Sequence, residues 1–288
     1  MGIVAAMVEI SAREVGEVEA ANASGRPTAV FIHGLWLLPS SWDPWQAHFD
    51  AAGFATVAAG WPDDPATVEE ARAHPEVFAG KQVRQVADHV ADVIARLDDE
   101  PVIVGHSFGG LLTQILAGRG LSAASVAIDP APFRGVLPLP LSSLRSAFPV
   151  LANPLNWGRA VTLTYDQYRY GWANGLDETE AKELYEATHV AAPGAPLFQA
   201  ATANLNPWTE CRVDTRCPDR GPLLIISGEK DTTVPWALAN AAYKRQKHNE
   251  AVTEITELPN RGHSLVVDSG WPEVADTALA FLQRFVET

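Results

Sequence analysis

The sequence contains 288 residues, of which 47% are hydrophobic and 19% are charged, and its formal net charge is -14. This length and composition allow one large domain or two small ones with a sizeable core, and they exclude a disordered chain. We expect neither a nucleic-acid nor an anionic-membrane partner, because the sequence has no cluster of Lys and Arg. A membrane-spanning stretch and a signal peptide are also not evident, so we expect a cytoplasmic protein.

Short apolar runs alternate along the chain with amphipathic patterns. We predict strands at residues 28–32, 55–58, 102–104, 125–128, 223–226 and 252–258. We predict helices at residues 41–49, 81–97, 111–116 and 272–285, and a proline-containing loop at 61–80. Repeated strand, helix and strand indicate an α/β fold with a mostly parallel sheet covered on both faces.

Residues 131–207 break this alternation. They contain many prolines, no clear strand and short helical pieces such as residues 177–189, where Asp177 and Glu180 have capping-box spacing. We predict a helical cap at 131–207, inserted into a core domain formed by residues 1–130 and 208–288. We expect most of its aromatic residues to pack the cap onto the sheet and a few to line a pocket. The candidates for the pocket are Phe133, Phe148 and the adjoining Trp208.

The turn after the predicted strand 102–104 reads Gly105-His106-Ser107-Phe108-Gly109, a G-x-S-x-G sequence between a strand and a helix. A sharp strand-to-helix turn strains the backbone of its central residue and requires glycine on either side. This context favours Ser107 as an exposed nucleophile over an ordinary glycine-rich turn.

A serine hydroxyl needs a general base, and the base needs a carboxylate that fixes its tautomer. Two further loops follow predicted strands, one carrying Asp231 and the other His263. The carboxyl ends of parallel strands meet at one edge of a sheet, so we expect Ser107, Asp231 and His263 to lie together there. Asp129, at the end of strand 125–128, is an alternative or supporting acid.

These motifs resemble the α/β-hydrolase family: the nucleophile turn at Ser107, Gly-Glu-Lys-Asp ending at Asp231, and Gly-His ending at His263. The resemblance covers about residues 28–285. It implies an eight-stranded sheet with a cap inserted after the sixth strand, although the first strands are hard to place before residue 25. By the same resemblance, the oxyanion donors are the backbone N–H groups of Phe108 and Leu35. Trp36, beside Leu35, is a candidate wall of the substrate pocket.

We therefore expect a serine hydrolase, a carboxylesterase, that cleaves small-to-medium apolar carboxylic esters through an acyl-enzyme, with no cofactor and no metal. Lactonase, thioesterase, carbon-carbon bond hydrolase and cofactor-free perhydrolase activities use the same three residues and stay open. A small-molecule receptor with a hydrolase-like fold is the non-enzyme alternative. Long interfacial substrates are disfavoured, because the cap carries four glutamates, Glu178, Glu180, Glu183 and Glu186.

The remaining polar residues are assigned smaller roles. His33 and His106 are expected to be structural, with His33 bracing the oxyanion loop. The two cysteines, Cys211 and Cys217, are expected to be free thiols, with a disulfide as the alternative. We expect a monomer or a homodimer.

Overall fold

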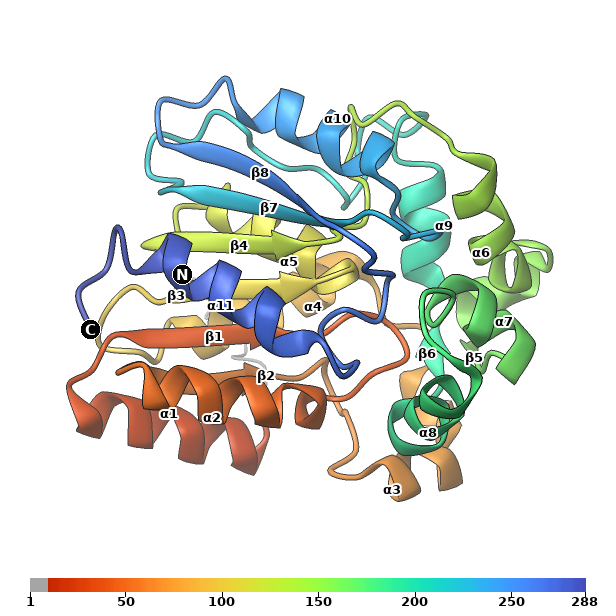
Figure 1. Ribbon diagram of the computed structural model, residues 1–288, viewed down its shortest axis with the longest axis horizontal. Coiled ribbons are helices and arrows are strands. Elements are labelled where there is room, and N and C mark those ends of the chain that lie inside the picture. The colour runs from red at the N-terminus through yellow and green to blue at the C-terminus, as the bar shows by residue number, and fades with distance from the viewer. Residues whose placement is uncertain (1–9) are drawn as a thin grey trace, which may run out of the picture.

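The computed structural model describes residues 10–288 and confirms the predicted α/β architecture (Figure 1). Six parallel strands form the main sheet, in the spatial order β2-β1-β3-β4-β7-β8. Their bounds are β1 Thr28–Ile32, β2 Ala55–Ala59, β3 Val102–His106, β4 Ala124–Ile128, β7 Leu223–Gly228 and β8 Thr253–Leu258. All residues of β1, β3, β4 and β7 are buried, because helices cover both faces of the sheet, and this explains their continuous apolar sequences.

The helices divide between the two faces of the sheet. One apolar cluster joins one face to α1 (Ala12–Ser24), α4 (Val83–Ile94), α5 (Phe108–Ala117) and α10 (Trp236–Gln246). The other cluster joins the opposite face to α2 (Asp43–Ala51) and α11 (Trp271–Leu282). Among residues 10–288, no helix is long and apolar enough to cross a bilayer.

Two expectations for the first eighty residues are wrong. Residues 12–24, where the resemblance implied early strands, form α1, which begins with a capping box between Ser11 and Glu14. The main sheet in the described part of the chain therefore has six strands rather than eight. The expected loop at 61–80 contains a short helix, α3 (Val68–Ala73), whose first turn is capped by the Thr67 hydroxyl, and a 3-10 turn at Pro75–Phe78.

The chain leaves the main sheet after β4 and returns to it at β7. The inserted segment therefore follows the fourth strand of this sheet in chain order, and the expected insertion after a sixth strand is wrong. We call residues 131–207 the cap segment. It contains α6 (Leu141–Leu151), α7 (Tyr165–Gly171), α8 (Glu178–Thr188), α9 (Ala195–Ala201), a 3-10 turn (Pro154–Gly158) and the short antiparallel strands β5 (Ala160–Val161) and β6 (Ala192–Pro193). In Figure 1 these green elements lie together on the right, beyond one end of the main sheet.

The predicted capping box of α8 is not formed. Asp177 does accept hydrogen bonds from the N–H groups of Thr179 and Glu180, but the Glu180 carboxylate accepts the Ser269 N–H of the core instead. Glu180 thus links the cap segment to the core, a long-range contact that the local sequence pattern does not contain.

Candidate active site

Ser107 occupies a strained turn between β3 and α5. Its φ is 57° and its ψ is −118°, a region that ordinary residues avoid. A Cβ atom on Gly105 would overlap the carbonyl oxygen of Gly109, and one on Gly109 would overlap the carbonyl oxygen of Ile32. Both glycines are therefore required by close backbone approach, and the turn holds the Ser107 side chain out at the start of α5.

Ser107, His263 and Asp231 are brought together from three loops at the same edge of the sheet. The Nε2 atom of His263 lies 3.0 Å from Ser107 Oγ, and its Nδ1 atom lies 2.6 Å from Asp231 Oδ2. The other oxygen of Asp231 accepts the N–H groups of Thr233 and Val234 at 2.6 and 2.8 Å. With Nδ1–H donating to Asp231, Nε2 is left unprotonated and able to accept the Ser107 proton.

Asp129 lies behind this arrangement and does not take the position of Asp231. It is fully buried at the end of β4, and its Oδ1 accepts the Gly228 N–H at 2.8 Å. Burial raises the pKa of Asp129 well above its usual value near 3.8, and the negative charge of Asp231 raises it further. Asp129 is therefore expected to hold its proton at neutral pH.

His106 and Trp172 enclose the His263 ring. The ring centroids lie 4.7 Å (His106) and 4.9 Å (Trp172) from that of His263. Burial lowers the pKa of His106 well below 6.5, so its ring is a neutral wall. One ligand atom each of His106, Asp129 and His263 lies within 4.8 Å of the others, which is compact enough for a metal ion. However, both nitrogens of His263 are already in hydrogen bonds with Ser107 and Asp231, so the group is not a preformed metal site.

The loop after β1 lies directly against Ser107. A Cβ atom on Gly34 would come within 2.8 Å of the Ser107 Cβ, so this loop also requires close backbone approach. The next residue is Leu35, and neither its N–H nor that of Phe108 donates to another backbone group within residues 10–288. Phe108 directly follows Ser107, and Leu35 directly follows the contacting Gly34, so the positions of both residues are compatible with the predicted oxyanion role. His33 braces the loop, because its Nε2 lies 2.9 Å from Asp64 Oδ2.

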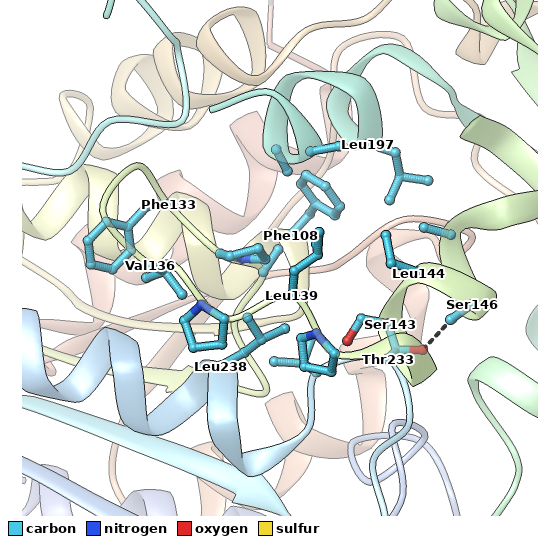
Figure 2. A pocket seen from close by; sticks show the side chains of 18 of the residues that line it. Phe108, Phe133, Val136, Leu139, Ser143, Leu144, Ser146, Leu197, Thr233 and Leu238 are labelled. Carbon is cyan, nitrogen blue, oxygen red and sulfur yellow. Dashed lines mark hydrogen bonds between the residues drawn. The ribbon is translucent and has the colours of Figure 1, made fainter. Parts of the chain in front are cut away.

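A cavity of about 370 Å³ opens above Ser107, between the core and the cap segment (Figure 2). Its walls are almost entirely aliphatic and aromatic, and no charged side chain lines it. Figure 2 shows Phe108, Phe133, Leu139, Leu144 and Leu197 around this space. The polar side chains of the lining are Ser107, Ser143, Ser146, Asn204 and Thr233.

Two of the four predicted pocket residues line the cavity. Trp36 and Phe133 do so, whereas Phe148 and Trp208 do not and are 65% and 84% exposed. On α6 the preceding residue, Ala147, is the one that faces the cavity, so Phe148 is turned toward solvent. The prediction favoured aromatic residues and missed the aliphatic walls, which come largely from Val136, from α6 and α9, and from Leu238 of α10.

Several other aromatic residues of the cap segment pack against one another within the cap segment. The Tyr168 and Trp172 rings stack with centroids 6.1 Å apart, and Tyr168 also contacts Tyr185 and His189. Both cysteines are free, and burial raises the pKa of the Cys211 thiol to about 12. Neither thiol is part of the site.

Comparisons with known proteins were made on both sequence and structure. The model of the protein family described as "Alpha/beta hydrolase family" matches residues 29–277 of this chain. A search of curated proteins found no match. Among solved structures, a monoacylglycerol lipase from Paleococcus ferrophilus is 18% identical with a TM-score of 0.61, and the match covers 90% of this chain and 95% of that one.

Two further structures are similarly related. An extracellular α/β-hydrolase from a Paenibacillus species, described as homologous to tobacco salicylic acid binding protein 2, is 18% identical with a TM-score of 0.63, covering 91% of this chain and 100% of that one. A bromoperoxidase from Bacillus anthracis is 17% identical with a TM-score of 0.64, covering 90% and 92%. Identities this low show a shared fold alone.

Proposed function

Because the chain belongs to the α/β-hydrolase family, we propose that it is a serine hydrolase that cleaves small-to-medium apolar carboxylic esters. One observation carries the proposal. The Ser107 hydroxyl lies 3.0 Å from a histidine that Asp231 orients, at the base of an apolar cavity. A nucleophile, a base and a group that orients the base, all within hydrogen-bond reach, are the minimum set for acyl transfer.

In the proposed reaction, Ser107 Oγ attacks the ester carbonyl carbon while His263 Nε2 takes its proton. The carbonyl oxygen becomes negatively charged and is stabilised by the N–H groups of Leu35 and Phe108. The tetrahedral intermediate then expels the alcohol, which receives the proton from His263. A water molecule, deprotonated by the same histidine, hydrolyses the acyl-enzyme and regenerates Ser107.

The substrate class follows from the cavity. A volume of about 370 Å³ is at the small end for ligand pockets, which suits a compact acyl or alcohol group. A charged substrate group would lose its hydration there without gaining a charged partner, since no charged side chain lines the cavity. These two features support an uncharged, apolar ester.

We also propose that the protein acts in the reducing cytoplasm, and its free cysteines are consistent with this location.

The test is hydrolysis of short-chain p-nitrophenyl esters by the wild type, by Ser107→Ala and by Ser143→Ala. Loss of Ser107 is expected to lower kcat/KM by at least ~10³-fold. Ser143→Ala is the matched control, since Ser143 lines the same cavity but makes no hydrogen bond to His263. Equal rates for the wild type and Ser107→Ala would contradict the proposal. A panel of lactones and thioesters would then identify the bond cleaved, and tight ligand binding without turnover would indicate a receptor.

A further inference from the structure

The cap segment exposes an unusual number of large apolar side chains around the mouth of the cavity. Twelve large hydrophobic residues are exposed within residues 10–288, and nine of them lie between positions 137 and 208. Leu137, Leu141 and Leu205 are 75%, 83% and 85% exposed. Scattered apolar residues are normal on a protein surface, but a concentration at one place marks a site of interaction.

Four of these residues belong to the cavity as well as to the surface. Leu137, Leu139, Leu144 and Leu205 line the cavity and are also exposed, so they form its entrance. Leu141 and Phe148 extend the same apolar surface along α6. We call these six residues the apolar rim.

The charge of the surrounding sequence differs from that of the rest of the chain. Residues 130–165 contain three arginines, Arg134, Arg145 and Arg159, and no Asp, Glu or Lys, in a chain whose net charge is -14. All three arginines are exposed. Residues 190–209, which include Leu205, contain no charged residue. The two sequence segments that carry the rim therefore contribute three positive charges and no negative charge, although the whole chain is acidic.

The four glutamates that argued against a lipid-facing cap lie elsewhere. They belong to α8, and Figure 1 shows α8 at the opposite end of the cap segment from α6. Charges farther away than about 8 Å are largely screened at physiological ionic strength, so the rim interacts with a surface mainly through its own side chains and the nearby arginines.

We propose that the apolar rim docks on an anionic phospholipid surface. The exposed leucines enter the outer part of the lipid layer, and the three arginines contact the negatively charged headgroups. Because four of the six rim residues form the entrance to the cavity, a lipid-dissolved apolar molecule reaches Ser107 without crossing water. This inference replaces the expectation of no membrane partner that the overall charge suggested. It depends on the exposure and charge of the rim and not on the proposed reaction.

The first experiment measures co-sedimentation with vesicles, comparing mixed phosphatidylglycerol and phosphatidylcholine with phosphatidylcholine alone. Binding is expected to the mixed vesicles, with weaker binding to phosphatidylcholine and weaker binding at high salt. Ser107→Ala is expected to bind as the wild type does, so a failure of the proposed esterase function leaves this result unchanged. Absence of binding to the mixed vesicles, or equal binding to both kinds, overturns the proposal.

The second experiment uses matched variants. Leu141→Glu together with Phe148→Glu is expected to weaken vesicle binding at least ~10-fold, because each change removes an inserting side chain and adds a negative charge. Val252→Glu is the control, since Val252 is 41% exposed at the start of β8, the opposite end of the strands. Neither Leu141 nor Phe148 lines the cavity, so hydrolysis of a monomeric ester is expected to be unchanged and verifies folding.

Unchanged vesicle binding by the Leu141→Glu, Phe148→Glu variant overturns the proposal. Sedimentation velocity tests whether the apolar rim instead binds a second copy of this chain. A wild-type dimer that dissociates on Leu141→Glu would show that the rim is a subunit interface, and this outcome also overturns lipid docking.

Discussion

His189 makes the stability of the cap segment sensitive to acid. It directly follows α8 and is 2% exposed, and its Nε2 accepts the Leu163 N–H at 3.2 Å. Burial, together with the smaller effect of the nearby positive charge of Arg72, lowers the pKa of His189 from 6.5 to about 4. The folded protein therefore keeps this imidazole neutral at pH values where an unfolded chain protonates it. Replacing His189 with Gln preserves a hydrogen-bond acceptor and removes the titration.

The sign and the size of the effect follow from the two pKa values. Between pH 6.5 and pH 4 the unfolded state binds a proton that the folded state does not, so the free energy of unfolding falls as the pH falls. A pKa lowered from 6.5 to about 4 corresponds to ~3 kcal/mol when the titration is complete, of which ~2 kcal/mol is lost by pH 5. Above pH 7 this histidine has no effect on the pH dependence of stability.

The assay is urea denaturation of the wild type and His189→Gln at a series of pH values between 8 and 5. On acidification to pH 5 the wild type is expected to lose ~2 kcal/mol more than the variant. Other buried groups, such as His106, titrate in both proteins, so their contributions cancel in the difference. Two stability curves that run parallel from pH 8 to pH 5 would refute the reasoning.

Substitutions at Asp129, Gly109 and Arg220 test the site and the core, with Gly158→Ala as a control. Asp129→Asn keeps an oxygen that accepts the Gly228 N–H, and it is expected to keep the wild-type pH profile of kcat/KM. Asp129→Ala leaves that N–H unpaired and is expected to lower the free energy of unfolding by ~1–3 kcal/mol in urea denaturation. Gly109→Ala is expected to abolish ester hydrolysis, while Gly158→Ala, with open space at its Cβ, keeps wild-type rates. Arg220 is fully buried and donates hydrogen bonds to five acceptor residues. Arg220→Leu is expected to lower the free energy of unfolding by at least ~3 kcal/mol, as measured by thermal unfolding.

The sequence was most informative where chemistry and backbone geometry coincide. Glycines at positions 105 and 109 predicted the turn that presents Ser107, itself buried, to the cavity. The apolar runs before Asp231 and His263 predicted that both residues follow strands. In the structure these three residues meet at one sheet edge. The family resemblance and the α/β fold are confirmed, whereas the catalytic roles remain predictions until the variants are assayed.

The cavity was harder to predict because its lining depends on tertiary packing. Phe148 and Ala147 are neighbours in α6, and only the placement of that helix decides which of them faces the cavity. In the run Leu137-Pro138-Leu139-Pro140-Leu141 the leucines recur every second residue, but the intervening prolines exclude a central strand, so its role at the entrance had no secondary-structure signal. Helix α1, by contrast, had a readable signal in the Ser11 and Glu14 spacing, which the family's strand count obscured.

Trp36 connects the oxyanion loop to the cap segment. Its φ is 64°, its indole N–H donates to the carbonyl of Val161 in β5 at 3.0 Å, and its own carbonyl accepts the Val190 N–H at 3.2 Å. Its neighbour in the sequence, Leu35, carries one of the two proposed oxyanion donors. Any displacement of β5 relative to the sheet must therefore either break these bonds or carry the donor loop with it. The position of the proposed oxyanion donor is therefore tied, through the side chain and the backbone carbonyl of Trp36, to the positions of β5 and Val190 in the cap segment.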